Sequence, residues 1–596
     1  MEMHPIDIGI MLAYVVAVVV IGVVLSRRAS EDLGSYFLGG NKVPWYILGT
    51  SNASSMFDIT GTMWLVYILF VYGLKGAFLP WLWPTFNQVF LMIYLAVWIR
   101  RSGVLTGGEW MGTRFGDKSG GELARVSVVI FAIISVIGFL SYAFKGIGKF
   151  AVVFFPWDLS PDTYAIIIMS ITTFYVILGG MYSVVITDLI QFALLTIVSI
   201  FIGYIAITKI GAADIAAVVP PGWSDLSFGW NLGLDWANQI PSVNDKIAAD
   251  GYSLFTIVIM MMLFKGFLVS LAGPSPNYDL QRILATRKPK ESAMMSAIVS
   301  VCLFPRWIMI AGFTTLALVF FSEDLQAMGG DIDFEMILPY VINNFIPVGI
   351  MGLLLAGLLA GFMSTFDSTV NAGASYLVVD IYKRYINPSG TEKKYITMSY
   401  ACSIIVVVVG FVFGLMAENI NSAMQWIVSG LWAGYTAPNL LKWHWWRLNG
   451  HGYFWGMIVG MIAAMVVPVA LPEVSPLNGF PIILAFSTLA SIGASLMTAP
   501  ENDDILKSFY RQVRPWGAWK PVLEKVLQDD PNFQRNTGFK RDLLNIVVGI
   551  IWQLTLVVIP IYMVLQDSSS MMIGIGVLIV TSIFLKKNWY DKLEDD

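Results

Sequence analysis

The stretch that decides the fold is Ala360-Gly361-Phe362-Met363-Ser364-Thr365-Phe366-Asp367-Ser368-Thr369, in the middle of an apolar segment covering residues 348–379. At about 3.6 residues per turn, four small or hydroxyl residues share one helix face: Gly361, Ser364, Thr365 and Ser368. Oxygen-bearing side chains at mid-membrane depth suit a small hard cation, although such residues also let helices pack closely in lipid. Asp367, at the flank of this face, favours the cation site because a carboxylate inside a membrane is costly and usually functional.

The composition indicates an integral membrane protein. The chain has 596 residues, of which 57% are hydrophobic and 13% charged, and apolar runs of about 20 residues recur along it. The net charge of −4 gives no reason to expect binding to nucleic acid. The three histidines are dispersed and the two cysteines lie inside apolar runs, so we expect no enzymatic site, no metal centre of the zinc or haem type and no cofactor.

The apolar runs predict an all-α membrane protein with about fifteen transmembrane helices. The predicted spans are 6–26, 44–73, 76–99, 122–148, 161–180, 183–208, 252–273, 291–321, 347–379, 395–417, 421–441, 452–471, 479–498, 543–565 and 570–586. Basic residues follow spans one, three, seven and nine and fill segment 499–542, whereas opposite loops such as 322–335 are acidic. The positive-inside rule then predicts a multi-pass protein of the cell (inner) membrane, with its N-terminus outside and its C-terminus in the cytoplasm.

The second predicted span is interrupted. Between Gly49 and Thr62 most residues are small or polar, and such a segment cannot face lipid. A helix broken there frees carbonyls and amides to bind ions and substrate. Asp58 is the costliest residue of this span, and we expect it to bind substrate or ion. The alternative is a structural ion pair with Lys265 or Arg306, two other charges placed inside predicted spans.

Five motifs occur in order between residues 6 and 500. They are Ser35-Tyr36-Phe37-Leu38-Gly39-Gly40 with Pro44-Trp45, Gly179-Gly180-Met181-Tyr182-Ser183 continuing to Thr187-Asp188-Leu189-Ile190-Gln191, Gln281-Arg282-Ile283-Leu284-Ala285, Asp380-Ile381-Tyr382-Lys383, and Trp446-Arg447-Leu448-Asn449. Together they resemble the sodium/solute symporter family, which includes the sodium–glucose cotransporters. The resemblance implies a leucine-transporter-like fold, with a five-plus-five inverted-repeat core and a broken first core helix.

This resemblance divides the chain into seven parts. They are an extra N-terminal helix (1–43), the first repeat (44–208), an extracellular loop (209–251), the second repeat (252–447), peripheral helices (448–498), a cytoplasmic amphipathic segment (499–542) and C-terminal helices (543–596). The 209–251 loop either covers an entrance or is a solvated connector.

The resemblance also implies sodium sites. The main site would use backbone carbonyls of Ser54, Phe57 and Gly361 and the hydroxyls of Ser364 and Thr365. The positions of a second site, present in some members of the family, match Asp188, Asp367 and Ser368. Asp367 stands where a hydroxyl residue is common, and the alternative for Asp188 is a hydrogen bond between helices.

The residues that bind sugar in the family's sugar transporters are absent at the matching positions. In their place, the predicted substrate-binding residues are Asp58, Lys145, Lys265, Trp64 and Trp426. Lys145 lies near the outer end of its helix, so an alternative is that it extends to the membrane interface.

The predicted function is sodium-coupled symport by alternating access. Its partners are the sodium ion, a small polar solute and the lipid bilayer. We expect the solute to be a sugar or sugar-like compound. An amine, an amino acid or a carboxylate such as an acidic sugar is the alternative, and a channel or a transporter-like sensor is a more distant one.

Overall fold

The computed structural model describes residues 4–29, 32–82, 85–155, 157–227, 229–256 and 266–594. Helices account for nearly all regular structure in these ranges, and no strand pairing beyond one isolated bridge occurs in them. The longer helices are α1 (Pro5–Ala29), α8 (Ser119–Phe154), α9 (Pro161–Lys209), α16 (Phe304–Phe320), α19 (Ile350–Ser375), α20 (Glu392–Met416), α23 (Gly450–Ala470), α24 (Pro476–Met497), α27 (Phe539–Leu565) and α28 (Ser568–Asn588).

Shorter helices connect and interrupt these. They are α2 (Leu33–Leu38), α3 (Trp45–Met56), α4 (Ile59–Tyr72), α5 (Thr85–Phe90), α6 (Ala96–Arg100), α7 (Gly107–Phe115), α10 (Ala212–Val218), α11 (Ser242–Asp250), α12 (Leu254–Thr256), α13 (Ser270–Ala272), α14 (Tyr278–Ala285), α15 (Pro289–Cys302), α17 (Ser322–Met328), α18 (Ile337–Phe345), α21 (Ile420–Gln425), α22 (Trp432–His444), α25 (Asp503–Val513) and α26 (Lys520–Asp529). Tighter or wider helical turns are η1 (Gly39–Asn41), η2 (Gly73–Leu82), η3 (Leu91–Leu95), η5 (Gly329–Asp331), η6 (Phe334–Met336), η7 (Tyr376–Ile386), η8 (Trp426–Leu431) and η9 (Tyr590–Lys592).

The second predicted span is a broken helix, α3 followed by α4. Phe57 leaves the helical region, with φ −93° and ψ 50°. Asp58 then starts α4 as its N-cap residue, because its side chain accepts a hydrogen bond from the backbone N–H of Gly61 at 2.9 Å. The interruption predicted between residues 49 and 62 therefore lies at Phe57 and Asp58.

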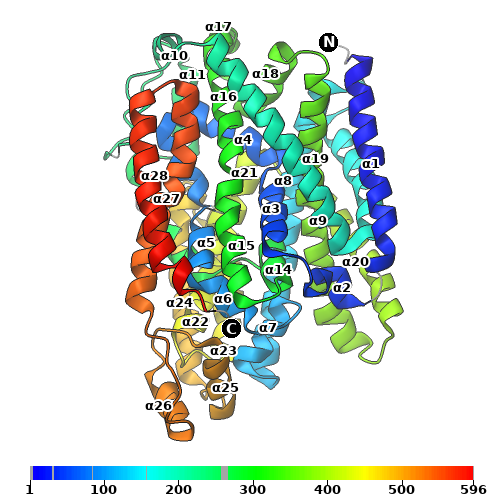
Figure 1. Cartoon of the computed structure of the whole chain (residues 1–596), viewed down its shortest axis with the longest axis vertical. Coiled ribbons are helices and arrows are strands. Elements are labelled where there is room, and N and C mark those ends of the chain that lie inside the picture. Colours follow the sequence, from blue (N-terminus) through cyan, green and yellow to red (C-terminus); the bar gives the residue numbers. More distant parts are fainter. Residues whose placement is uncertain are drawn as a thin grey trace.

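Helix α19 carries the opening stretch and packs among α1, α3, α8, α9 and α20. In Figure 1, α1 lies at one side of the bundle and the antiparallel pair α27 and α28 at the other, with α25 and α26 below the helices. Within α19, residues 360–375 are all buried. The hydroxyls of this helix are therefore enclosed by protein and do not face lipid.

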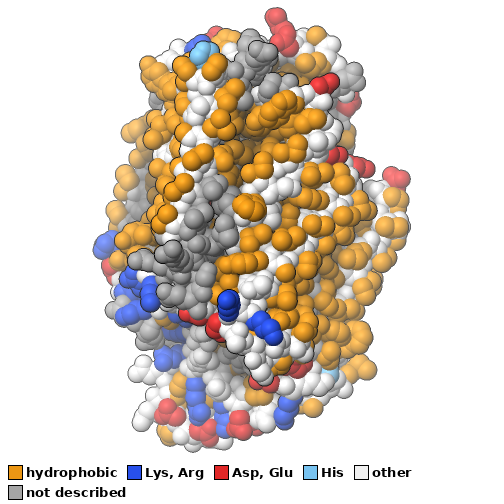
Figure 2. Space-filling model, turned by 90° about the vertical axis from the view of Figure 1, so that its right-hand side faces the viewer, with side chains coloured by type: hydrophobic (Ala, Val, Ile, Leu, Met, Phe, Trp, Pro, Cys, Tyr) orange, Lys and Arg blue, Asp and Glu red, His pale blue; other side chains and the backbone are white. Residues whose placement is uncertain are grey.

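The outer surface fits a bilayer. Figure 2 shows a broad face covered by hydrophobic side chains, with Lys and Arg gathered toward its lower end. Apolar residues on this surface include Leu12 and Val16 of α1 and Val408 and Val412 of α20, each more than half exposed. Such a surface is stable only in contact with lipid.

The predicted number of fifteen spans is not confirmed. Ten helices in the described part of the chain are long and apolar enough to cross a membrane. The prediction counted the broken pair α3 and α4 as one span, and it counted residues 421–441, which are divided into α21, η8 and α22. The predicted spans 161–180 and 183–208 both lie in the single element α9, and much of span 252–273 lies outside the described residues.

Candidate functional site

The residues predicted for the main sodium site meet where α19 packs against the break between α3 and α4. A Cβ atom on Gly361 would lie only 2.4 Å from the carbonyl oxygen of Phe57, so the two backbones touch. The Thr365 hydroxyl donates to the carbonyl oxygens of Ser55 and Gly361. All five predicted residues belong to these two segments: Ser54, Phe57, Gly361, Ser364 and Thr365.

Carbonyl and hydroxyl oxygens therefore line the seam between α19 and the end of α3. Ser54 and Ser364 are fully buried, and Thr365 is 8% exposed. Oxygen atoms of this kind are the ligands that hard cations prefer. The two sides of the seam come from distant parts of the sequence, so an ion bound there would hold two separate helical elements together.

The positions matched to a second sodium site lie beside this seam, but they already have a cationic partner. Arg282 of α14 donates from Nη2 to the Asp188 carboxylate at 3.1 Å and to the Ser368 hydroxyl at 2.9 Å. It also donates to the Ser55 hydroxyl at 2.7 Å. Asp188 accepts two further hydrogen bonds, from Ser51 and Ser364.

The guanidinium of Arg282 thus supplies the positive charge at Asp188 that a second sodium ion was predicted to supply. Its side chain is 1% exposed and that of Asp188 is 0% exposed. Asp367, the third predicted residue of this site, is buried on α19 beside Ser368. Arg282 belongs to the motif Gln281-Arg282-Ile283-Leu284-Ala285 but was not predicted as a site residue, because its burial depends on the way α14 folds back onto α3.

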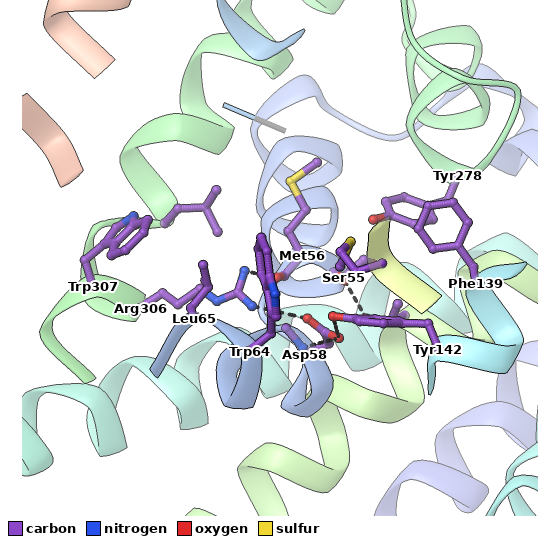
Figure 3. Close-up of a pocket in the computed structure, with 14 residues that line it drawn as sticks. Ser55, Met56, Asp58, Trp64, Leu65, Phe139, Tyr142, Tyr278, Arg306 and Trp307 are labelled. Atoms are coloured by element: carbon purple, nitrogen blue, oxygen red, sulfur yellow. Dashed lines mark hydrogen bonds and ion pairs between the residues drawn. The ribbon is translucent and has the colours of Figure 1, made fainter. Parts of the chain in front are cut away.

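A cavity borders the break on the other side, with about 50 Å³ of free volume. Fourteen residues line it, among them Ser55, Asp58, Trp64, Tyr142 and Thr365. Figure 3 shows Arg306 and Tyr142 approaching the Asp58 carboxylate from opposite sides, with the indole ring of Trp64 nearby. In this conformation the volume suffices for a few water molecules, so a larger solute enters only when the lining side chains move apart.

Asp58 is held by two donors besides its capping bond. Arg306 Nη2 lies 3.2 Å from the carboxylate and the Tyr142 hydroxyl lies 3.3 Å from it. Arg306 also donates to the free carbonyl of Met56. Asp58 therefore forms the ion pair with Arg306 that was the alternative, and it also lines the cavity. A role in binding substrate or ion stays a prediction. An arginine inside an apolar span is itself a signal of function. Arg306 was predicted only as a possible ion-pair partner of Asp58, not as a residue of the site.

The other residues predicted to bind substrate are dispersed. Trp64 lines the cavity. Lys145 pairs instead with Asp162 at 3.1 Å and is not among the residues that line the cavity. Trp426 is partly buried and lies against Gly138 of α8. Lys265 lies outside the described residues.

A hydrogen-bond chain joins the cavity to the 209–251 loop. Trp64 Nε1 donates to the Asn421 side chain at 3.1 Å, and Asn421 donates to Asp250 of α11 at 3.1 Å. Asp250 also accepts from the Tyr72 hydroxyl at 2.8 Å and from Lys246 at 3.0 Å. Burial, with the charge of Glu335 added, raises the pKa of the Asp250 carboxyl to about 8. This part of the loop is docked onto α4 and α21, as a cover would be.

Comparisons with known proteins agree with this architecture. The model of the sodium:solute symporter family matches residues 36–460. The chain is 25% identical to sodium/glucose cotransporter 4 of Danio rerio over 575 residues, covering 88% of this chain and 83% of that protein. It is 24% identical to the sodium/glucose cotransporter of Vibrio parahaemolyticus over 562 residues, covering 84% and 92%.

Among solved structures, the fold resembles that of a Na⁺-coupled sialic acid symporter in a substrate-bound, outward-open state. The TM-score is 0.64 at 17% sequence identity, and the likeness covers 84% of this chain and 99% of that one. This similarity concerns the fold.

The chain belongs to the sodium:solute symporter family. It is a multi-pass membrane transporter and not an enzyme, and the predictions of its family, of a leucine-transporter-like helical fold and of sodium-coupled symport are confirmed.

Proposed function

We propose that this chain imports a neutral sugar or a sugar-like polyol, with one sodium ion per solute. The observation that carries the choice of solute is the Asp58–Arg306 ion pair in the cavity wall. The pair presents hydrogen-bond donors and acceptors without net charge, which suits a solute rich in hydroxyl groups. Trp64 and Tyr142 add aromatic surface with polar edges to the same cavity.

The coupling follows from residues shared between the two sites. Ser55 and Thr365 line the solute cavity, and both also take part in the seam between α3 and α19. A sodium ion that draws the seam together would fix the wall of the cavity and raise affinity for the solute. By linkage, bound solute raises the affinity for sodium by the same factor.

The stoichiometry of one sodium ion is supported by Arg282. Its guanidinium already bonds to Asp188 and Ser368, two of the three residues matched to a second sodium site. A sodium ion at that site would have to displace a buried arginine from a carboxylate, which costs several kcal/mol.

An acidic sugar is the second candidate. Arg306 could pair with a solute carboxylate if Asp58 turned away, and the fold resembles that of a sialic acid symporter. The neutral solute is preferred because Arg306 is already held by Asp58 and by the Met56 carbonyl.

For localisation, we propose the cell membrane, with the N-terminus outside and the C-terminus in the cytoplasm. The basic segments between the predicted spans support this orientation. The α11 cover would then lie on the outer side.

The experiment is an uptake screen with purified protein in liposomes under an inward sodium gradient. The panel contains neutral hexoses, polyols, amino sugars, sialic acid, amino acids and carboxylates. We expect one or more neutral sugars or polyols to accumulate only with sodium. The variant Asp58→Asn should retain sodium binding and weaken uptake of that solute about tenfold or more, since it removes a charged hydrogen-bond partner.

Preferential accumulation of sialic acid would show that the solute is an acidic sugar and not a neutral one. Accumulation driven by a proton gradient and not by sodium would contradict the proposal. Lys145→Met is the matched control, because Lys145 pairs with Asp162 away from the cavity, and its uptake should equal that of the wild type.

A further inference from the structure

A second, smaller cavity lies apart from the solute cavity, between α7, α22 and the segment that follows α13. Its free volume is about 20 Å³, which is room for one particle of the size of water or chloride. Trp110 of α7 and Asn439, Lys442 and Trp443 of α22 line it. None of the residues discussed for sodium or solute contributes to its lining.

Lys442 brings an unusual positive charge to this cavity. Its side chain is buried, donates to the Asn439 side-chain oxygen at 2.7 Å, and lies over the rings of Trp110 and Trp443 at 4.8 and 5.2 Å. An ammonium group has three donors. Within the described part of the chain, the acceptor of this ammonium is the neutral Asn439 side chain, so the charge is buried without an ionic partner there.

Trp110 adds a second, independent observation. The residue is 3% exposed, and its indole Nε1 has no hydrogen-bond acceptor among the described residues. A buried donor without an acceptor costs about 1–3 kcal/mol. Both Trp110 and Lys442 line the same cavity, and both have donors to spare.

The surroundings make the cavity more positive. Arg114, one turn after Trp110 on α7, is fully buried and donates to the carbonyls of Lys442 and Leu448, both at 3.0 Å. Two carboxylates near α7 are engaged elsewhere: that of Asp380 is paired with Arg125 at 2.6 Å, and that of Glu109 accepts from the backbone N–H of Leu105 at 2.9 Å. Among the described residues, the aromatic rings of Trp110 and Trp443 are what partly offsets the charge of Lys442, and no anionic group pairs with it.

We propose that this cavity binds one small inorganic anion of the size of chloride, held by the Lys442 ammonium and the Trp110 indole N–H. An anion satisfies both donors and offsets the buried charge. A water molecule would leave the charge in place, and the volume is too small for phosphate or for the carboxylate of an organic solute. The proposal does not depend on which solute the protein carries. Its expected effect is to hold α7 against the inner half of α22.

The test measures thermal unfolding of the purified full-length protein in detergent at constant sodium and ionic strength, while gluconate is replaced stepwise by chloride. A ligand that binds only the folded state raises the unfolding midpoint saturably. We expect such a rise with chloride and with bromide. Trp110→Phe keeps an aromatic ring and removes the N–H, and it should raise the half-saturating chloride concentration about tenfold or more.

Lys442→Met removes the charge at similar side-chain length and should abolish the chloride effect. Lys75→Met is the matched control, since Lys75 is also buried and donates to a carbonyl, that of Leu232 at 2.9 Å, in another part of the fold. It should lower stability and leave the chloride response unchanged. A midpoint indifferent to chloride in the wild type, or an unaltered response in Trp110→Phe, would overturn the proposal.

Discussion

Thr365 and Thr369 lie one turn apart on α19 and are both buried, but they serve different purposes. Thr365 reaches across to the carbonyl of Ser55, whereas among the described residues Thr369 bonds back to its own helix, to the Thr365 carbonyl at 2.7 Å. We expect Thr365→Val to raise the half-saturating sodium concentration for uptake about tenfold or more, because it removes one oxygen from the seam and keeps the shape.

Thr369→Val is the control for this prediction and should leave sodium activation unchanged. The measurement is initial uptake rate against sodium concentration in proteoliposomes. Equal sodium curves for wild type and Thr365→Val would remove Thr365 from the sodium site.

Arg282 gives a second prediction at the scale of single residues. Arg282→Gln leaves the Asp188 carboxylate buried without its guanidinium partner, and we expect a loss of about 3 kcal/mol in the free energy of unfolding when sodium is absent. Sodium should then restore part of this loss by binding at Asp188. Thermal unfolding in sodium and in choline measures both effects.

The double variant Asp188→Asn with Arg282→Gln removes both charges together. It should be more stable than Arg282→Gln alone in choline, and its unfolding midpoint should gain less from sodium. If sodium stabilises all the variants and the wild type equally, Arg282 does not stand in for a second ion.

The sequence predicts best those arrangements that depend on neighbours along the chain. Ser364 and Thr365 share a helix face by periodicity alone, and the structure brings that face against Phe57. Arg282 and Arg306 were not predicted as site residues because their positions depend on contacts between elements more than 200 residues apart. A single sequence without detectable internal symmetry carries no information on such contacts.

At the scale of elements, the packing of α19 on the broken helix depends on one glycine. An added methyl group on Gly361 would lie 2.4 Å from the Phe57 carbonyl oxygen, whereas on Gly357 it would meet Leu195 at an ordinary 3.5 Å. We expect Gly361→Ala to push α19 from the break and to reduce sodium-driven uptake at least about tenfold.

Gly357→Ala is the matched control, one turn away on the same helix. It should keep uptake within about twofold of wild type, since alanine favours the helix and no backbone atom obstructs it. Normal sodium-driven uptake by Gly361→Ala would contradict the close packing of the two segments.

Docking of α11 should depend on pH through Asp250. A free aspartate loses its proton near pH 4, but docked Asp250 keeps it to about pH 8. The docked state therefore binds the proton more tightly, so docking is strongest below about pH 4, weakens as the pH rises to about 8 and then levels off. The groups that face this carboxylate are the Lys246 ammonium, the Tyr72 hydroxyl and the Asn421 amide, which all donate to it.

Hydrogen exchange of residues 242–250, corrected for its intrinsic pH dependence, measures this effect. We expect protection in the wild type to fall between pH 6 and 8 by up to about tenfold per pH unit. Asp250→Asn keeps the acceptor oxygen and should show no such fall. Equal pH dependence in both proteins would contradict the role of Asp250.

The boundaries of helices were predictable only where a local sequence feature, such as a capping residue or a polar cluster, sets them. The break in the second span was predicted from its polar composition, and its position follows from capping by Asp58. The division of residues 421–441 into α21, η8 and α22 has no comparable signal, because a wide helical turn needs neither proline nor a polar cluster.

At the scale of the whole molecule, hydropathy predicted the membrane class and the motifs predicted the family. The seven domain boundaries stay predictions. Tertiary contacts, such as those of α19 with α1, α9 and α20, determine how the described helices pack into a common core. Those contacts join amphipathic surfaces of similar composition, so the sequence pattern does not distinguish one pairing from another.

The central claim is that one sodium ion, bound between α3 and α19, drives the import of one neutral solute bound in the cavity beside Asp58. The most direct measurement is steady-state accumulation of the solute in proteoliposomes with equal sodium on both sides and an inside-negative potential of about 100 mV. One charge moving across that potential supplies about 2.3 kcal/mol, which corresponds to an accumulation ratio of up to about fiftyfold. We predict a ratio below this limit that requires sodium. A ratio well above fiftyfold, or accumulation that persists when choline replaces sodium, would contradict the account.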